Sequence, residues 1–494
     1  MMADQSLQQL FVGLVDLSAV PDCRIRGLTL DSRQVRPGYL FLAIPGTVTD
    51  GRLHLQDALA AGAMAVAYEA DPGEHPVQVA AAPGCFAVKD LHKRCGLLAA
   101  RFYQHPSRQL QVIAVTGTNG KSTVCWLLAQ ALTAAGRKCA VIGTLGCGFP
   151  PEVTTTGLTT PDPIRLQQQL ALLRRQGATA VAVELSSHGL DQYRDQGLAV
   201  NRAVFTNLSR DHLDYHGSFA DYEASKLRLF CRPGLDAVIV NDDDPVAMRI
   251  RQQSRAPIVG YRVSNAGPAS AVDLVIAVVH ATDRALVLRL SYRAKALALE
   301  VPLLGEFNAS NIAAVVGVLL TLQISIATMP PIFCELQAPP GRMEYFASAD
   351  QRRRVVVDFA HTPDALARAL CSLRPHTRGQ LWCVFGCGGD RDTGKRPQMG
   401  AVAEQFADQV ILTDDNVRHE TPEAIIADIE AGMQGPHRVI HDRLLAIRTV
   451  LAEAAAQDLV LVAGKGHERT QQIGDAYQPF CDRDVVQDLL RPAA

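Results

Sequence analysis

The stretch Val112 to Thr123, VIAVTGTNGKST, decides the fold of this chain, because a strand pattern passes through a glycine turn into a helix pattern. The β-branched run before the turn is typical of a buried strand, and VCWLLAQALTAAG after it predicts a helix. Gly117 and Gly120 let backbone N–H groups face an anion, and the helix start adds its own free N–H groups. Lys121 supplies a cation for phosphate, and the Ser122 hydroxyl suits Mg²⁺.

One position departs from the general phosphate-loop pattern G-x-x-x-x-G-K-[ST], because Val115 stands where the first glycine is usual. The alternative interpretation is an ordinary glycine turn between a strand and a helix. The strand–turn–helix context, with Lys121 and Ser122 directly after the glycines, favours a nucleotide site.

Length and composition bound the class of protein. A chain of 494 residues, 48% hydrophobic and 20% charged, predicts a globular protein of about three domains. The net charge of −2 gives no reason to expect nucleic acid or a membrane surface as a partner. The start of the chain lacks a signal-peptide pattern, and no apolar run reaches the roughly 20 residues that span a bilayer. Twelve scattered cysteines argue against a zinc site or a disulfide framework and favour a reducing cytoplasm.

Three α/β segments follow one another along the chain. Residues 1–107 read as a small α/β domain, and 108–338 alternate strands and helices as in a parallel sheet wound on both sides. Within the second segment, residues 257–305 alternate polar and apolar positions and predict an antiparallel addition to the sheet. Residues 339–494 are again alternating α/β, which predicts a C-terminal Rossmann-like domain.

Charged side chains stand where strands end. Glu184 follows the buried-looking run AVAV, and a carboxylate there is either a helix cap or a Mg²⁺ ligand; its place at the same sheet edge as Lys121 favours the metal. In the third segment, GKGHE could be a second phosphate loop, but it lacks a following Ser/Thr and a helix pattern. Arg391 and Glu468 on converging loops instead suit a zwitterionic amino acid.

The order TGTNGKST, TTPD, ELSSHGL, DHLDYHGS, EASK, VDFAHTPDAL, GCGGDRDTGKRP, DDNVRHE and GKGHE resembles the Mur ligase family, MurE type, over nearly the whole chain. The resemblance implies an ATP-dependent ligase that adds meso-diaminopimelate to UDP-N-acetylmuramoyl-L-alanyl-D-glutamate through an acyl phosphate. It implies ATP and Mg²⁺ as cofactors, small-molecule partners only, and a cytoplasmic monomer. The alternatives are the same chemistry with L-lysine, a folylpolyglutamate-type ligase, and a non-catalytic nucleotide-binding regulator.

The resemblance also implies a metal and nucleotide site. His212 and Lys226 would join Ser122 and Glu184 around Mg²⁺, with Lys226 carbamylated by CO₂; from its pattern alone, Lys226 reads as a solvated lysine on an amphipathic helix. Lys121, Glu184, His212 and Lys226 would be the catalytic set. The residues implied to bind ATP are Gly117, Thr118, Asn119, Gly120, Lys121, Ser122, Thr123, Asn308, Asn311, Arg342, Asp358 and His361. The alternative role of Asn308 and Asn311 is helix N-capping.

Two substrate sites complete what the resemblance implies. The UDP-muramoyl dipeptide would contact the loop 47–49 and the residues Leu30, Ser32, Thr159, Thr160, Ser186, Gln192 and Arg194, although Asp31-Ser32-Arg33 alone reads as a solvated turn. Diaminopimelate would contact Arg391, Asp415, Asn416, Val417, Arg418, Gly464 and Glu468. Val417 stands where the family typically has proline, which removes a fixed φ angle from this loop.

Overall fold

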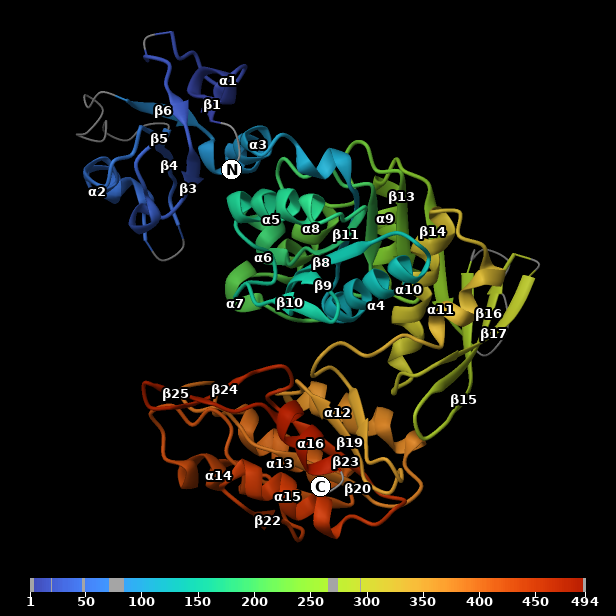
Figure 1. The fold of residues 1–494 in the computed structure, drawn as a ribbon. Coiled ribbons are helices and arrows are strands. Elements are labelled where there is room, and N and C mark those ends of the chain that lie inside the picture. Colours follow the sequence, from blue (N-terminus) through green and yellow to red (C-terminus); the bar gives the residue numbers. More distant parts are fainter. Residues whose placement is uncertain are drawn as a thin grey trace. The chain divides into compact units, whose positions relative to one another are not determined.

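The computed structural model describes residues 4–18, 20–46, 49–70, 84–264, 274–293 and 295–491. The chain divides into two compact units: residues 1–121, 136–240 and 244–258 make unit 1, and residues 122–135, 241–243 and 259–494 make unit 2. Both units are α/β, so the predicted class is confirmed (Figure 1). No helix in the described ranges is long and apolar enough to cross a bilayer. The domain boundaries after residues 107 and 338 stay predictions.

The N-terminal part of unit 1 is a small parallel sheet with short helices. Its strands are β3 (Gly27–Thr29), β4 (Tyr39–Ala43), β5 (Ala65–Ala70) and β6 (Cys85–Lys89), in that order, beside the pair β1 (Gln5–Ser6) and β2 (Arg24–Ile25). The helices are α1 (Leu7–Phe11), α2 (Leu55–Ala60), α3 (Leu91–Phe102) and the 3₁₀ turns Ser32–Gln34, Gly51–His54 and Pro106–Gln109. Ile164 and Ala171 of α5 (Pro163–Arg175) belong to the same hydrophobic core, which ties this part to the rest of unit 1.

The larger sheet of unit 1 places the phosphate loop at its centre. The parallel strands run in the order β8 (Cys139–Gly143), β11 (Ala180–Glu184), β7 (Gln111–Thr116), β12 (Arg202–Phe205) and β13 (Ala237–Asn241). The strands β9 (Gly146–Phe149) and β10 (Glu152–Thr154) extend the β8 edge antiparallel, and the other helices are α6 (Ser187–Asp191), α7 (Leu213–His216), α8 (Phe219–Leu227) and α9 (Val246–Gln253). Because β11 and β12 flank β7 on opposite sides, the carboxyl end of β7 is a topological switch point, where such folds bind ligands.

Unit 2 includes α4 (Lys121–Ala134) from Ser122 onward and contains two sheet segments. The strands β14 (Ile258–Val263), β15 (Leu274–Ala281), β16 (Leu286–Tyr292) and β17 (Lys295–Val301) include the predicted antiparallel addition, since β15, β16 and β17 pair antiparallel. They are followed by α10 (Phe307–Thr321), a 3₁₀ turn (Ile326–Thr328) and α11 (Met329–Phe333). The antiparallel prediction is therefore confirmed for β15, β16 and β17, but it is wrong for β14, which pairs parallel with β15.

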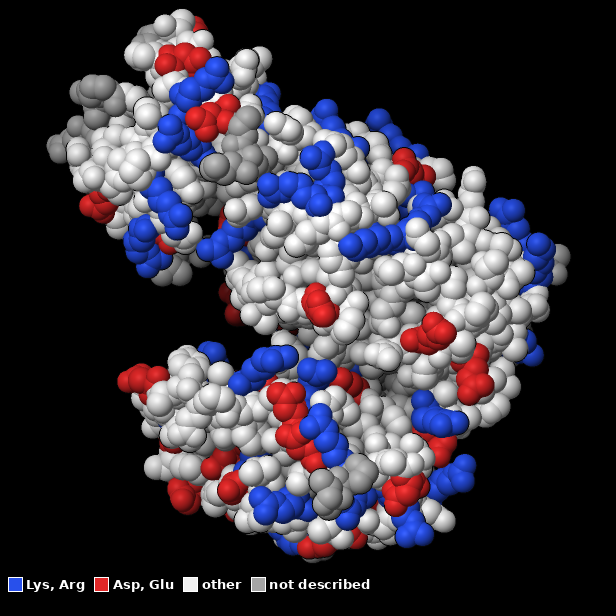
Figure 2. Space-filling view, in the orientation of Figure 1, with Lys and Arg blue, Asp and Glu red and all other residues white. Residues whose placement is uncertain are grey.

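The C-terminal sheet has helices on both faces, as a doubly wound fold requires (Figure 1). Its order is β18 (Glu344–Ala347), β19 (Arg354–Asp358), β23 (Leu459–Ala463), β20 (Leu381–Phe385), β21 (Gln409–Leu412) and β22 (Arg438–Val439), with only the β18 edge antiparallel. One face packs on α12 (Pro363–Leu373), α13 (Lys395–Phe406) and α14 (Pro422–Glu430), and the other on α15 (Arg443–Glu453) and α16 (Asp482–Leu490). Acidic and basic side chains are interspersed over the surface of the C-terminal part in the view of Figure 2.

Candidate active site

The predicted phosphate loop joins β7 to α4, and its backbone requires glycine. Gly117 and Gly120 have φ angles of 149° and 85°. A Cβ atom on Gly117 would lie 1.9 Å from the Thr206 hydroxyl oxygen, so only glycine fits there. Asn207 accepts hydrogen bonds from the backbone N–H groups of residues 118 and 119, at 2.8 and 2.9 Å, through its carbonyl and its side chain. The strand–turn–helix prediction is confirmed, and the loop is fastened to the strand beside β7.

Two lysines meet on one carbonyl of this loop. The Lys121 amine donates to the backbone oxygens of Gly117, at 3.0 Å, and Thr118, at 2.8 Å. The Lys226 amine donates to the same Gly117 oxygen at 2.8 Å from α8, more than 100 residues along the chain. The structure thus brings together the two lysines that the sequence motifs selected separately.

Lys226 is not a solvated lysine, because only 3% of it is exposed. Its amine lies 4.7 Å from the centre of the Tyr222 ring. Burial and the neighbouring Lys121 lower the pKa of the Lys226 amine well below its ordinary value, since both disfavour a positive charge. A neutral amine is nucleophilic, which is the property that addition of CO₂ requires.

Glu184 ends β11, beside the strand that leads into the phosphate loop. Its carboxylate is 2% exposed and accepts hydrogen bonds from Thr144 N, at 3.0 Å, and Thr144 Oγ1, at 3.1 Å. The following helix α6 is capped by the Ser186 hydroxyl, which accepts from Gly189 N. The helix-capping alternative for Glu184 is therefore wrong.

His212 lies at the start of α7 in a left-handed backbone conformation, with a φ angle of 51°. Its half-exposed ring contacts the His188 ring, with centroids 4.8 Å apart, and the Tyr222 ring, at 6.2 Å. Tyr222 connects this histidine to the loop, because its hydroxyl hydrogen-bonds Thr118 at 2.8 Å. His188 and His216 belong to the same ring cluster, and burial lowers the pKa of each. ELSSHGL and DHLDYHGS contain both, but a single histidine on an apolar helix gave no separate signal.

The donors near the loop suit magnesium only in part. In the described part of the chain, no three His, Cys, Asp or Glu side chains come together as a metal cage. Mg²⁺ is usually held by one or two carboxylates together with substrate phosphates, so a complete protein cage is not expected. Glu184 supplies one carboxylate, Ser122 stands at the start of α4, and Lys226 would become a second carboxylate only as a carbamate. With that modification, the residues fit Mg²⁺ bound jointly with phosphate.

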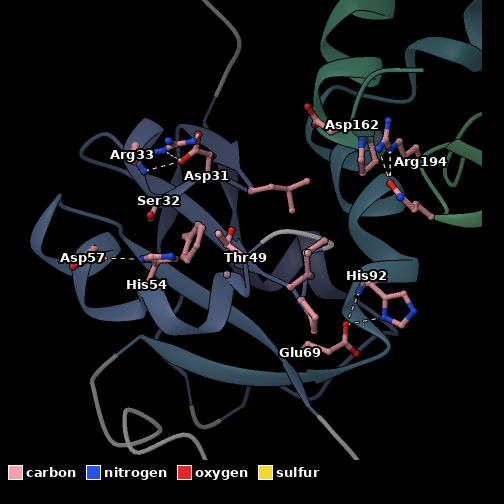
Figure 3. Close-up of a pocket in the computed structure, with 18 of the residues that line it drawn as sticks. Asp31, Ser32, Arg33, Thr49, His54, Asp57, Glu69, His92, Asp162 and Arg194 are labelled. Atoms are coloured by element: carbon pink, nitrogen blue, oxygen red, sulfur yellow. Dashed lines mark hydrogen bonds and ion pairs between the residues drawn. The ribbon is translucent and has the colours of Figure 1, made fainter. Parts of the chain in front are cut away.

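A large pocket of about 1300 Å³ lies within unit 1, between the N-terminal sheet and α5–α6 (Figure 3). Leu30 and Ser32 line it from one side, and Gln192 and Arg194 from the other, so four residues predicted for the UDP-muramoyl dipeptide share one cavity. Thr49 also lines it. Thr47 and Val48 of the predicted loop lie outside the described residues.

Hydrogen bonds lead from this pocket toward the phosphate loop. Arg194 donates to the Thr160 backbone oxygen at 2.7 Å, and the Thr160 hydroxyl donates to the Glu184 backbone oxygen at 2.9 Å. Thr160 also hydrogen-bonds the Ser186 hydroxyl at 3.2 Å, and Thr159 bonds Thr144, which in turn bonds the Glu184 carboxylate. Thr159, Thr160 and Ser186 therefore lie between the pocket and Glu184.

Several pocket residues were missed from the sequence. Glu69 is 6% exposed, and its carboxylate accepts from the N–H groups of Leu91 and His92 at the start of α3, at 3.0 and 2.7 Å. The His54 ring pairs with Asp57 at 3.1 Å on the opposite wall (Figure 3). No spacing in the sequence links residues that the fold brings together from separate strands and helices.

Asn308 and Asn311 lie within the first two turns of α10, where both are buried. The Asn308 amide donates to the Leu304 oxygen at 2.7 Å, and the Asn311 amide donates to Asn308 Oδ1 at 2.8 Å. Neither caps the helix, because the N-cap position is Glu306. The N-capping alternative is therefore wrong.

Arg342 and His361 contact the Phe359 ring, and Asp358 directly precedes that residue at the carboxyl end of β19. The Arg342 guanidinium lies 4.6 Å from the ring centre, and the His361 ring contacts it with centroids 4.6 Å apart. Asp358 accepts from the N–H groups of Met343 and Ala360, both at 2.8 Å. Burial raises the pKa of the Asp358 carboxyl, and Arg342 opposes that shift. The three residues predicted near ATP in this segment do lie together.

Most residues predicted for diaminopimelate form one cluster. The Asn416 amide donates to Glu468 Oε2 at 2.9 Å, and a Cβ atom on Gly464 would lie 2.7 Å from Asp415 Oδ2. Arg418 donates to the Gly389 oxygen at 2.7 Å, and a hairpin of β24 (Thr470–Ile473) and β25 (Ala476–Pro479) pairs with it. That hairpin, rather than a helix, follows GKGHE, in agreement with the rejection of a second phosphate loop. Val417 turns into the hydrophobic core, and Arg391 is exposed.

Two buried cations of the C-terminal segment were missed from the sequence, and the first of them contacts this cluster. The Lys465 amine, fully buried, lies 3.1 Å from both Asn416 Oδ1 and Glu468 Oε2. Arg396 is 1% exposed and binds Glu420, at 2.8 and 2.9 Å, and the Gly388 oxygen, at 3.1 Å. Their motifs GKGHE and GKRP are visible, but nothing in either indicates that Lys465 or Arg396 is buried.

Comparison with known proteins agrees with this arrangement. Three family models match: "Mur ligase family, catalytic domain" over residues 24–103, "Mur ligase middle domain" over 115–319, and "Mur ligase, glutamate ligase domain" over 341–466. The UDP-N-acetylmuramoyl-L-alanyl-D-glutamate–2,6-diaminopimelate ligase of Ectopseudomonas mendocina is 49% identical, covering 94% of this chain and 95% of its own. The ligase of the same name from Pseudomonas aeruginosa is 48% identical over 98% of both chains. A solved structure of a ligase of this name has a TM-score of 0.74, at 36% identity over 99% of both chains.

Proposed function

The chain belongs to the Mur ligase family, and we propose that it is an ATP-dependent ligase that joins meso-diaminopimelate to UDP-N-acetylmuramoyl-L-alanyl-D-glutamate. The substrate assignment is supported by relatives of that name, 48 and 49% identical over nearly their whole length. The structural observation that carries the proposal is the meeting of Lys121 and Lys226 on the Gly117 carbonyl, at 3.0 and 2.8 Å. Such an arrangement is suited to phosphoryl transfer, in which positioned charges do most of the work.

The reaction we propose has two steps. The D-glutamate γ-carboxylate attacks the terminal phosphorus of ATP, giving an acyl phosphate and ADP. The neutral amine of diaminopimelate then attacks the acyl carbon, and the tetrahedral oxyanion collapses to an amide and phosphate. Lys121 would place its positive charge on the transferring phosphoryl group, and donors at the start of α4 would bind the phosphate oxygens.

The magnesium site is proposed from the residues that fit it. Ser122, Glu184, His212 and Lys226 would hold Mg²⁺, and Mg²⁺, when bound, neutralises charge on the β- and γ-phosphates. Carbamylation of Lys226 adds CO₂ to the neutral amine and releases a proton, so a buried amine becomes a carboxylate. Its burial and its depressed pKa support this modification.

The substrate sites follow from the two clusters. We assign the UDP-muramoyl dipeptide to the pocket lined by Leu30, Ser32, Gln192 and Arg194, with Thr159, Thr160 and Ser186 leading toward Glu184. We assign diaminopimelate to the cluster of Asp415, Asn416, Arg418, Gly464 and Glu468, with Arg391 beside it. Asn308, Asn311, Arg342, Asp358 and His361 would contact ATP. We also expect a cytoplasmic monomer, because every site is proposed within one chain and the family resemblance implies a cytoplasmic ligase.

An amino-acid panel tests the proposal. The protein is incubated with ATP, Mg²⁺, bicarbonate and the UDP-muramoyl dipeptide, and ADP and phosphate release are measured with meso-diaminopimelate, L-lysine, L-glutamate or no amino acid. We expect release that depends on meso-diaminopimelate. Equal ADP and phosphate release with L-lysine would indicate a lysine-adding ligase. Release that depends on L-glutamate would indicate a folylpolyglutamate-type enzyme. Release that no amino acid stimulates would favour a nucleotide-binding regulator.

A further inference from the structure

Lys465 places a buried ammonium group among the polar side chains proposed to hold diaminopimelate. It follows β23, and none of its surface is exposed. Its Nζ atom donates to Asn416 Oδ1 and Glu468 Oε2, both at 3.1 Å, and lies 3.9 Å from Asp415 Oδ1. A buried ammonium is tolerated only where acceptors surround it in this way.

This ammonium fixes the orientation of the Asn416 amide. Asn416 Oδ1 accepts from Lys465 and also from the backbone N–H of Gln472 in β24, at 2.9 Å. Neither partner can accept a hydrogen bond, so the oxygen must face them and the NH₂ group must face Glu468. One N–H of Asn416 bonds Glu468, which leaves the other as a donor suited to a carboxylate.

The same ammonium fixes Glu468 as an acceptor. Glu468 Oε2 receives bonds from both Lys465 and Asn416, while its side chain remains 35% exposed. The bonds from Lys465 and Asn416 to Oε2 restrict rotation of the carboxylate. The position of the other oxygen, Oε1, is therefore fixed as well. Asp415, Glu468 and Lys465 together retain one negative charge, which favours an incoming ammonium group.

We propose that Lys465 is a positioning residue for the amino-acid substrate: it aligns Asn416 to donate to the carboxylate, and Glu468 to accept from the ammonium, of one amino-acid centre. This inference rests on the proposed function. Lys465 itself is enclosed and acts through its two neighbours, without touching the substrate. Without it, Asp415 and Glu468 lose the cation that they share and the Asn416 oxygen loses a donor, so both contacts become misaligned.

Lys465→Met tests the proposal, because methionine keeps much of the length but removes the charge. We expect the KM for diaminopimelate to rise at least about 10-fold, the usual consequence of removing one partner of a buried charge pair, while the KM for ATP changes little. Val450→Ala, a cavity in the core of α15, is the matched control for lost stability in the same unit. An equal rise in the diaminopimelate KM in both variants would overturn the proposal.

A double-mutant cycle separates positioning from general damage. If Lys465 acts by holding Glu468, the two substitutions should not add. The double variant Lys465→Met/Glu468→Gln should then have a kcat/KM for diaminopimelate no lower than that of the more impaired single variant. Multiplication of the two single losses would show that the residues act independently and would refute the proposed role. Failure of the wild type to use diaminopimelate would refute the proposed function instead, and the same cycle would then be run with the amino acid that it does use.

Discussion

Lys226 and Lys465, the two buried lysines among the described residues, stand in opposite electrostatic surroundings. Lys226, 3% exposed, faces a backbone carbonyl, an aromatic ring and the second lysine Lys121. Lys465, fully buried, is ion-paired with Glu468 and has Asp415 at 3.9 Å. The environment of Lys226 disfavours a charged amine, whereas the carboxylates around Lys465 offset the cost of burying its charge. Two similarly buried lysines therefore differ in charge preference, which is the basis of the separate roles proposed for them: carbamylation of Lys226 and positioning by Lys465.

The largest loss of activity should come from removing Lys121, the cation beside Lys226. We expect Lys121→Ala to reduce ligation by at least about 10² to 10³, because the transferring phosphoryl group loses its positioned charge. Single-turnover ADP formation with saturating substrates measures the loss. Lys138→Ala, an exposed lysine of unit 1 whose amine bonds the Gln176 oxygen, is the control. Near-normal turnover of Lys121→Ala would mean that the phosphate loop had been misassigned.

Lys226→Arg should be nearly as damaging, and it separates the two buried lysines by chemistry. Arginine keeps a positive charge but forms no carbamate, so we expect activity to fall by about 10² or more. The wild type should lose activity in CO₂-depleted buffer and regain it with bicarbonate. The residual activity of Lys465→Met should show the same bicarbonate dependence, because that substitution leaves Lys226 intact. Full activity of Lys226→Arg, or indifference of the wild type to CO₂, would exclude the carbamate.

Sequence patterns predicted the site wherever a local rule applied. The glycines of the phosphate loop, Glu184 at a strand end and the antiparallel strands β15–β17 all follow from short-range patterns. The motif likeness added Lys226, whose helix alone reads as solvated although the fold buries it. Fold-level packing, not helix periodicity, decides that burial.

What could not be predicted depends on contacts between distant segments. Lys465 is the one lysine of GKGHE and Arg396 follows Lys395 in GKRP, and only the fold shows that both are enclosed. Glu69 and His92 meet because β5 runs beside the start of α3, 22 residues later. Val417 illustrates the opposite case, because a valine in place of the usual proline left the shape of this loop in doubt. In the structure the Val417 side chain packs in the core. The Val417 carbonyl accepts a hydrogen bond from Glu420 N at 3.2 Å, a contact that proline would also make.

Arg418→Ala tests the amino-acid pocket with a smaller expected effect. A guanidinium can grip the second carboxylate of diaminopimelate with two parallel hydrogen bonds, and L-lysine lacks that group. We expect the KM for diaminopimelate to rise about 10- to 100-fold, the KM for ATP to stay unchanged, and the preference over L-lysine to shrink. Arg448→Ala, an exposed arginine of α15, serves as the control. Unchanged discrimination between the two amino acids would remove Arg418 from the assignment while leaving the ligase function intact.

The smallest effect concerns stability and follows from the lowered pKa of Lys226. The folded protein releases the Lys226 proton at a lower pH than the unfolded chain, whose lysines titrate near 10.5. Below the folded pKa, the buried charge lowers the free energy of unfolding in full; between the folded pKa and 10.5 the unfolded state binds more protons, so stability rises with pH. Lys226→Met removes the amine, and Gly117 keeps the Lys121 amine as a donor.

In CO₂-depleted buffer at pH 7 we therefore expect this variant to unfold a few degrees above the wild type, and we expect this gap in unfolding temperature to close toward pH 10.5. Thermal unfolding of both proteins from pH 7 to 10.5 measures the gap, because other titrating groups act equally on the two. A gap independent of pH would mean that Lys226 lowers the stability of the protein through its packing and not through its charge. The contrast between the two buried lysines would then not be electrostatic.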